Sequence, residues 1–204
     1  MKVAEVFYSL QGEGKNQGRP TVFLRLAGCN LACRWCDTPS ARDGGVEWRT
    51  AEVVDAVRAV AGSCRLVCVT GGEPLLQQEA LVPVLEALSR EGFSCEIETN
   101  GTIPFGPSRA HAGITMDVKC PSSGEESDLS LLSALGPEDA VKFVVADTTD
   151  LAYAGRVLAE HPTRAEVFVS PVHGVELSPL VEYILEQHLP VRFSLQLHKL
   201  IGVR

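Results

Sequence analysis

The sequence has no long hydrophobic run. Its 204 residues are 45% hydrophobic, yet no apolar stretch reaches the ~18 residues that a membrane-spanning helix requires. The opening residues, MKVAEVFYSLQGEG, also lack the apolar segment of a secretory signal. We therefore expect a cytoplasmic protein that has no membrane partner.

Basic residues are outnumbered in this chain. It carries 18 Lys and Arg against 26 Asp and Glu, which gives a formal net charge of −8. Because recognition of nucleic-acid phosphates depends on clustered Lys and Arg, this balance argues against a nucleic-acid partner. With 22% charged residues and no linker or repeat, the composition is that of one globular domain spanning residues 1–204.

The seven cysteines do not suggest a disulfide framework, because their number is odd and the expected compartment is reducing. Three of them, Cys29, Cys33 and Cys36, form a Cys-x3-Cys-x2-Cys run. This spacing also suits one stripe of a buried helix, but the Gly, Asn, Asp and Pro residues around it favour a loop that binds metal. Zinc sites and ordinary ferredoxin clusters take four ligands, whereas a 4Fe-4S cluster held by three thiolates leaves one iron open.

Short apolar ranges are predicted as strands, and the stretches between several of them have the periodicity of helices. The strand candidates are residues 21–28, 65–70, 94–99, 113–118, 141–145, 165–170 and 191–197. Such alternation indicates a parallel sheet, and 204 residues fall short of the ~250 of a complete eight-fold barrel. The predicted fold class is therefore α/β, an incomplete parallel (β/α) barrel.

Polar and glycine-rich segments follow the predicted strands. The cysteine run follows the first strand, GGEP (71–74) follows the second, and PVHG (171–174) follows the sixth. Because the carboxyl ends of parallel strands meet at one edge of a sheet, we expect an active site at that edge.

Arg25 stands within VFLRLAG, an otherwise apolar strand candidate. A buried guanidinium without an anion is costly, so Arg25 needs a carboxylate partner. Two partners remain open. One is a structural salt bridge, and the other is a substrate carboxylate, which a planar guanidinium can hold through two hydrogen bonds.

The cysteine run, with Trp35 just before its third cysteine and GGEP after the next strand, resembles the radical S-adenosylmethionine (SAM) superfamily. The resemblance implies a 4Fe-4S cluster on Cys29, Cys33 and Cys36, whose open iron chelates the amino and carboxylate groups of SAM. Electron transfer to SAM then yields a 5′-deoxyadenosyl radical. An external electron donor such as flavodoxin is implied as a partner, because the sequence has one cluster motif.

Two longer segments, FYSLQGEGKNQGRPTVFLRLAGCNLACRWCDT and LQLHKLIG, resemble the 7-carboxy-7-deazaguanine synthase family. This resemblance implies conversion of 6-carboxy-5,6,7,8-tetrahydropterin to 7-carboxy-7-deazaguanine with release of ammonia, on the route to queuosine and other 7-deazapurines. It also implies a homodimer, a Mg²⁺ ion on Thr38, and a substrate pocket completed by the segments 1–20 and 191–204. Without it, Asp37 and Thr38 would be predicted as turn residues before Pro39.

The same resemblance implies two sets of contact residues. Those expected around SAM are Trp35, Cys36, Asp37, Gly72, Asp117, Val118, Lys119, Ser170, Pro171, Val172 and His173. Those expected around the pterin are Leu10, Gln11, Gly12, Arg25, Thr70 and Arg204.

Two other functions remain open at this point. A glycyl-radical-enzyme activase would share the cysteine run and GGEP, but a protein substrate gives no evident use to Arg25 and the LQGEG segment. A noncatalytic iron-sulfur or zinc module would need the cysteines alone, which leaves the glycine pair and the strand pattern without a purpose.

Overall fold

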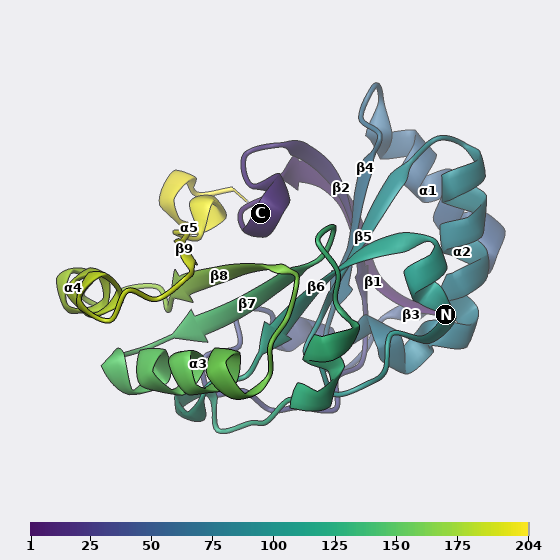
Figure 1. The fold of residues 1–204 in the computed structure, drawn as a ribbon. Helices are drawn as coiled ribbons and strands as arrows, with labels where there is room; N and C mark the ends of the chain where they lie inside the picture. The colour runs from purple at the N-terminus through teal and green to yellow at the C-terminus, as the bar shows by residue number, and fades with distance from the viewer. Residues whose placement is uncertain (204) are drawn as a thin grey trace.

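The computed structural model describes residues 1–203, which form nine strands and five α-helices. The strands are β1 (Lys2–Leu10), β2 (Pro20–Leu26), β3 (Val46–Glu47), β4 (Leu66–Gly71), β5 (Ser94–Thr99), β6 (Ala112–Val118), β7 (Ala140–Val145), β8 (Glu166–Pro171) and β9 (Arg192–Phe193). The helices are α1 (Thr50–Ala61), α2 (Gln78–Arg90), α3 (Thr148–Glu160), α4 (Ser178–Glu186) and α5 (Leu197–Ile201). Short 3-10 turns, among them η1 (Gly14–Asn16), lie between several of these elements (Figure 1).

All nine strands belong to one sheet of order β3-β1-β2-β4-β5-β6-β7-β8-β9. Strand β1 is antiparallel to both β2 and β3, whereas every neighbouring pair from β2 to β9 is parallel. Within residues 1–203 the outermost strands, β3 and β9, do not pair with each other, so the curved sheet stays open (Figure 1). The predicted fold class, an α/β incomplete parallel barrel, is confirmed.

The two faces of the sheet carry different side chains. On β2, the fully buried Val22, Leu24 and Leu26 belong to the apolar core, whereas Phe23 and Arg25 line a cavity inside the barrel. This alternation follows from the two-residue period of a strand. The apolar core therefore lies on the outer face of the sheet, and the inner face can carry polar groups.

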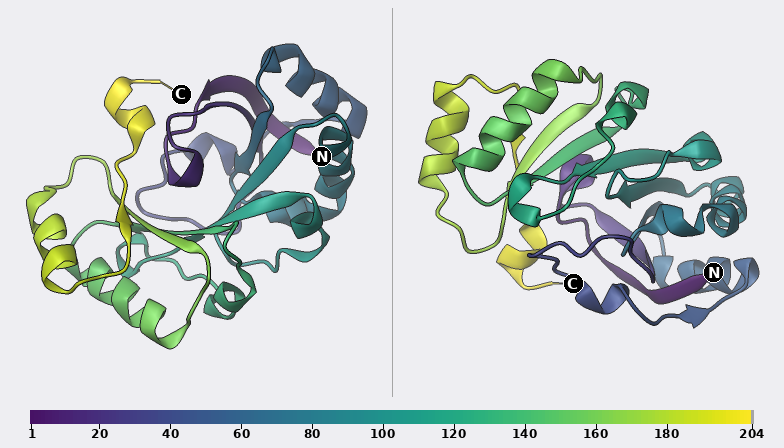
Figure 2. Two further views of the ribbon diagram at one scale, coloured as in Figure 1. Left: turned by 45° about the horizontal axis from the view of Figure 1, so that its top comes forward. Right: turned by 90° about the horizontal axis from the view of Figure 1, so that it is seen from below.

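Helices α1, α2 and α3 cover the outer face because each has an apolar stripe. In α2, the buried residues Leu81, Val84, Leu85 and Leu88 recur at the spacing of one helix face. Helices α1 and α2 pack together over β1, β2 and β5, while α3 contacts both β7 and α4 (Figures 1 and 2). In the described part of the chain, no helix is both long enough and apolar enough to cross a membrane.

The C-terminal segment returns to the loop that follows β1. The Leu197 N–H donates to the Gly12 carbonyl at 2.9 Å, and Gln17 Nε2 donates to the Leu195 carbonyl at 2.6 Å. Helix α5 therefore lies beside the N-terminal loop (Figure 1).

The strand prediction was wrong near both ends of the chain. Strand β1 was not among the candidate ranges, because KVAEVFYSL is largely half-exposed and alternates only loosely. The two-residue strand β3 was also missed. The range 191–197 contains only the short β9, because after Ser194 the chain leaves β8 and enters α5.

Replacing Leu85 by Ala tests the packing of α2 on the sheet. The Leu85 side chain is 0% exposed, so its truncation should leave a cavity and lower the free energy of unfolding by about 2–5 kcal/mol, measured by urea denaturation. Leu185→Ala in α4 is the matched control, because Leu185 is 66% exposed and should change stability by less than about 0.5 kcal/mol. Equal losses in the two variants would mean that Leu85 does not belong to the core.

Candidate active site

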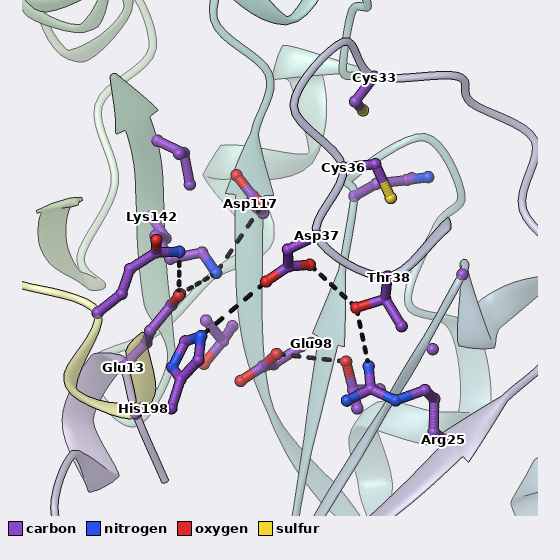
Figure 3. A pocket seen from close by; sticks show the side chains of 18 of the residues that line it. Glu13, Arg25, Cys33, Cys36, Asp37, Thr38, Glu98, Asp117, Lys142 and His198 are labelled. Carbon is purple, nitrogen blue, oxygen red and sulfur yellow. Dashed lines mark hydrogen bonds and ion pairs between the residues drawn. The ribbon is translucent and has the colours of Figure 1, made fainter. Parts of the chain in front are cut away.

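A cavity of about 400 Å³ opens at the carboxyl ends of the parallel strands (Figure 3). Its lining comes from the inner face of the sheet, from the loops after β1, β2 and β4, and from the C-terminal segment. The volume lies in the range of roughly 300–1,000 Å³ that is usual for small-molecule sites. The cavity lies at the edge where the polar segments of the sequence were expected to meet.

Cys29, Cys33 and Cys36 line this cavity from an irregular loop after β2. All three are free, partly exposed thiols, and Arg42 Nη2 fastens the loop by donating to the Cys33 carbonyl at 2.9 Å. Among residues 1–203 no other cysteine lines the cavity. Three thiols without a fourth fit a 4Fe-4S cluster that keeps one iron open to a small molecule.

The GGEP turn after β4 lies directly against the cysteine loop. A Cβ atom on Gly72 would lie 2.2 Å from the carbonyl oxygen of Gly28, so any other residue would push the two loops apart. Glu73 is fully buried and accepts hydrogen bonds from Thr99 Oγ1 at 2.9 Å and from the Asn100 N–H at 2.6 Å. Burial raises the pKa of Glu73, and these hydrogen bonds oppose the rise. Glu73 therefore ties the turn to β5.

Arg25 is paired inside the protein and also faces the cavity. Its Nε donates to Glu5 Oε1 at 2.9 Å, and its Nη1 donates to Thr38 Oγ1 at 3.5 Å. The guanidinium carbon lies 5.6 Å from the centre of the Phe7 ring. Because a guanidinium has five N–H donors and the Arg25 side chain is 17% exposed at the cavity, it can hold Glu5 and still meet a substrate carboxylate.

Asp37 and Thr38 form a corner at the end of the cysteine loop. Thr38 Oγ1 donates to Asp37 Oδ1 at 3.0 Å (Figure 3). Lys199 Nζ lies 3.5 Å from Asp37 Oδ2. Burial raises the pKa of Asp37, but the Thr38 hydrogen bond and the charge of Lys199 outweigh burial and lower the pKa overall. An ionised carboxylate beside a hydroxyl offers the hard oxygen atoms that Mg²⁺ binds, so the corner fits this ion.

The residues expected around SAM fall into two groups. Those that line the cavity are Trp35, Cys36, Asp37, Gly72, Asp117, Lys119, Val172 and His173. In the part of the chain that the structure describes, Val118, Ser170 and Pro171 are buried and do not line it. The strand period explains Val118, because β6 turns Asp117 toward the cavity and the next side chain into the apolar core.

One carboxylate oxygen of Asp117 is buried and unpaired. Asp117 Oδ2 accepts from Lys119 Nζ at 2.8 Å, but Oδ1 has no hydrogen-bond partner among residues 1–203. Trp35 lies nearby, with Lys119 Nζ 5.8 Å from its ring centre. A buried acceptor without a donor is costly, so this corner fits a ligand with hydroxyl groups, such as the ribose of SAM.

Most of the residues expected to contact the pterin line the cavity, namely Leu10, Gln11, Gly12, Arg25 and Thr70. Arg204 lies outside the described residues. Both N–H groups of the Gln11 side-chain amide are engaged within the protein. Its Nε2 donates to Glu96 Oε1 at 2.7 Å and to Glu98 Oε1 at 3.1 Å. The close packing of α5 requires a glycine at position 12, because a Cβ atom on Gly12 would lie 2.0 Å from Nδ1 of His198.

Several polar residues of the cavity were not predicted from the sequence, namely Glu13, Glu98, Lys142, Gln196 and His198. A signal existed for Glu98 and Lys142, because each interrupts a strand candidate at a position that alternates with apolar residues. No local pattern identifies Glu13 or His198, because they reach the cavity from segments that meet only in the folded chain.

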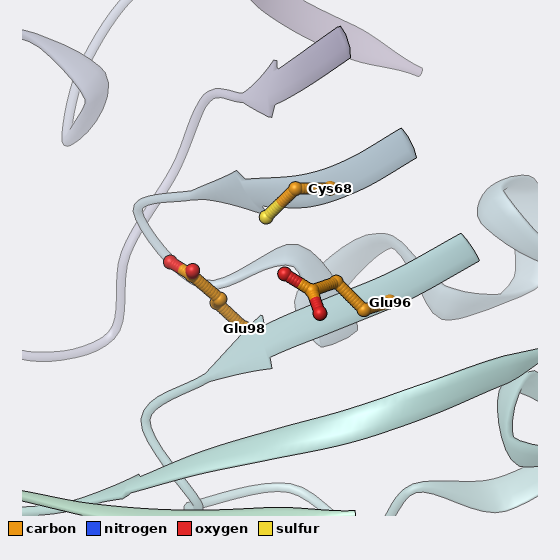
Figure 4. A group of neighbouring side chains, drawn as sticks. All are labelled: Cys68, Glu96 and Glu98. Carbon is orange, nitrogen blue, oxygen red and sulfur yellow. The ribbon is translucent and has the colours of Figure 1, made fainter. Parts of the chain in front are cut away.

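Cys68, Glu96 and Glu98 form a compact group beside the cavity (Figure 4). One ligand atom of each lies within 4.8 Å of the others, as a metal site would require. However, all four carboxylate oxygens already accept hydrogen bonds. Their donors are Gln11, Asn16 and Thr70. Burial, together with the neighbouring charge of Glu98, raises the pKa of Glu96. The group therefore supports Gln11 through hydrogen bonds.

Comparison with known proteins adds to this geometry. The family model of the radical SAM superfamily matches residues 24–112, which include the cysteine loop and the GGEP turn. A 7-carboxy-7-deazaguanine synthase of Methanospirillum hungatei JF-1 is 51% identical over 203 residues, which cover 100% of this chain and 86% of that protein. One of Koribacter versatilis is 36% identical over 219 residues, covering 98% of this chain and 96% of that protein.

A solved structure agrees with these sequence relatives. The crystal structure of QueE from Escherichia coli has a TM-score of 0.75 and 26% identity to this chain, and the match covers 97% of this chain and 94% of that one. The incomplete barrel is therefore of the radical SAM type, as the resemblance predicted, and an iron-sulfur cluster and SAM are the cofactors that this superfamily implies. Because relatives that are 51% and 36% identical match nearly its whole length, the chain belongs to the 7-carboxy-7-deazaguanine synthase family of the radical SAM superfamily.

Proposed function

We propose that this enzyme converts 6-carboxy-5,6,7,8-tetrahydropterin to 7-carboxy-7-deazaguanine with release of ammonia, a step in queuosine and 7-deazapurine biosynthesis. The observation that carries the proposal is a single cavity lined both by three free cysteines and by Arg25, Glu13 and Glu98. A guanidinium suits the substrate carboxylate, and carboxylates suit the N–H groups of the pterin. Relatives that match nearly the whole chain are named 7-carboxy-7-deazaguanine synthase, which agrees with the product of the proposed reaction.

The protein residues have binding and positioning roles in this proposal. When bound, the cluster and SAM would supply radical chemistry, the abstraction of a hydrogen atom from C6 of the pterin. Cys29, Cys33 and Cys36 would hold the cluster, and Asp117 would accept a hydrogen bond from SAM. Arg25 would hold the substrate carboxylate.

Mg²⁺ is the third cofactor of the proposal, with the Thr38 hydroxyl as its protein ligand. Thr38 lies between Arg25 and Asp37, so an ion there would stand beside the proposed position of the substrate carboxylate. A single weak protein ligand is compatible with Mg²⁺, because this ion commonly keeps several waters and also binds substrate oxygens.

We infer one domain over residues 1–204, in which the segments 1–20 and 191–204 complete the substrate pocket. Glu13 from the first segment and His198 from the second support this inference, because both line the cavity. A homodimer, an external electron donor such as flavodoxin, and a cytoplasmic location stay predictions.

An anaerobic assay tests the proposed reaction. Reduced protein with a reconstituted cluster, incubated with SAM and the pterin, should release 7-carboxy-7-deazaguanine and ammonia in equal amounts, measured by mass spectrometry and an ammonia assay. A Cys29, Cys33 and Cys36 triple alanine variant should lose iron and product, whereas Cys64→Ala should keep both because Cys64 lies outside the cavity. Cleavage of SAM without consumption of the pterin would contradict the proposal and favour a glycyl-radical-enzyme activase.

Arg25→Ala tests recognition of the substrate carboxylate. The variant should keep its cluster but bind the pterin at least about tenfold more weakly, because hydrogen bonds between charged groups are worth about 1.5–3 kcal/mol. Anaerobic calorimetry measures the dissociation constant. Arg58→Ala is the control, since Arg58 forms ion pairs on the surface of α1 and not at the cavity. An unchanged affinity for the pterin in Arg25→Ala would mean that Arg25 has only a structural role, as the ion-pair partner of Glu5.

Thr38→Ala tests the magnesium ligand. Loss of the hydroxyl should raise the Mg²⁺ concentration for half-maximal product formation by roughly an order of magnitude, as is usual when the support of a metal site is removed. Thr38→Ser keeps the hydroxyl and should retain the normal requirement. If the Ala and Ser variants require the same Mg²⁺ concentration, Thr38 is not a ligand.

A further inference from the structure

Lys142 is a buried lysine inside the barrel, and the roles described above do not include it. It stands on β7, is 8% exposed, and lines the cavity. Its Nζ forms an ion pair with Glu13 Oε2 and lies 3.9 Å from Asp117 Oδ2 (Figure 3). A buried ammonium group is costly unless it is paired, so the surrounding carboxylates determine whether this lysine can be accommodated.

Glu13 lies at the other end of this ion pair, on the loop after β1. It is 9% exposed, and its Oε1 accepts a hydrogen bond from Gln196 Nε2 at 2.6 Å. Burial by itself would raise the pKa of Glu13, but the charge and hydrogen bond of Lys142 outweigh burial and lower the pKa overall. The carboxyl is therefore an anion at neutral pH, although it is almost completely buried.

The two contacts leave part of the Glu13 carboxylate available to a ligand. A carboxylate has about four acceptor positions, and Lys142 and Gln196 occupy one on each oxygen. An ionised carboxylate can only accept hydrogen bonds, so at the cavity surface Glu13 selects a partner with N–H groups. The pterin has amino and ring N–H groups along one edge, which match this requirement.

We propose that Lys142 is a positioning residue for pterin binding, because it keeps Glu13 ionised and oriented toward the cavity. The pterin part of this inference rests on the proposed function, whereas the coupling of the two side chains does not. Lys142 itself acts through Glu13 and needs no contact with the substrate.

Other charged groups face this pair and also influence the pKa values of Lys142 and Glu13. Around Lys142 they are Asp117 on β6, Glu98 on β5 and Lys119 after β6. His198 faces Glu13 from α5, and burial lowers the pKa of this imidazole. Lys142 is the cation in direct contact with Glu13, so its removal should change the ionisation of Glu13 more than any other single substitution.

Lys142→Met tests the coupling directly, because methionine keeps most of the side-chain volume without the charge. The ionisation of Glu13 is followed by NMR of protein labelled with ¹³C at glutamate side chains, with the Glu13 resonance assigned from Glu13→Gln. In the wild type the Glu13 pKa should lie below the ordinary value, and in Lys142→Met above it, because burial then outweighs the remaining hydrogen bond from Gln196 and the charge of His198. Lys142→Arg should retain the wild-type titration. An unchanged Glu13 titration in Lys142→Met would overturn the proposal, whether or not the protein binds a pterin.

A second experiment measures the affinity for the pterin, with protein that carries its cluster and SAM under anaerobic conditions. Wild-type affinity for the pterin should vary little between about pH 6 and 8, whereas Lys142→Met should bind about tenfold more weakly and lose further affinity as the pH falls and Glu13 takes up a proton. Lys15→Met is the control, because Lys15 is exposed and, within residues 1–203, its Nζ donates only to the Pro137 carbonyl at 2.9 Å.

A double-mutant cycle separates positioning from a general structural effect. In a Glu13→Gln background, Lys142→Met should change the pterin dissociation constant less than about twofold, because the residue through which it acts is already neutral. The same tenfold loss in both backgrounds would overturn the proposal. If wild-type protein binds no pterin at all, the proposed function fails, while the NMR titration still decides whether Lys142 controls Glu13.

Discussion

The curved sheet turns every second side chain of its strands inward, and in this chain several inward positions carry a charge. Arg25 on β2, Asp117 on β6 and Lys142 on β7 all face the same cavity. Charges removed from water have to be compensated by partners at close range. The arrangement of the cavity therefore depends on which segments supply the partners of these charged side chains.

The compensating groups come largely from segments outside the parallel strands. Arg25 is paired with Glu5 on the antiparallel strand β1, and Lys142 is paired with Glu13 on the following loop. The C-terminal segment completes the arrangement, since Gln196 donates to Glu13 and the His198 ring fills the space beside Gly12. Segments outside the parallel strands thus supply the partners that allow charged side chains inside the barrel.

This dependence explains how much of the site could be predicted from the sequence. The cysteine loop and the GGEP turn are local patterns whose chemistry depends on spacing, so they identify the iron-sulfur end of the cavity without a structure. The strand period could have separated Asp117, which faces the cavity, from Val118, which faces the core. The Lys142–Glu13 pair joins residues 129 positions apart, and no local pattern connects them.

Glu73 shows a related limit of motif-based reasoning. Within GGEP this acidic residue suggests a ligand contact, yet its carboxyl is turned away from the cavity and holds the end of β5. The glycine beside it has the more direct role, because Gly72 lets the turn touch the carbonyl of Gly28 in the cysteine loop. The GGEP motif therefore has a structural role, because it allows the turn and the cysteine loop to pack closely together.

The choice of charged pairs for the interior argues for selection on function. Buried ion pairs often stabilise a fold no better than apolar residues of similar volume, because the cost of desolvation offsets the attraction. An apolar lining would therefore have been adequate for folding, but it would provide neither a guanidinium for a carboxylate nor fixed acceptors for N–H groups. Fixed ions are oriented before the ligand arrives, whereas water would have to reorganise around it. The paired charges inside this barrel are best understood as a preorganised polar environment for a small, strongly polar ligand.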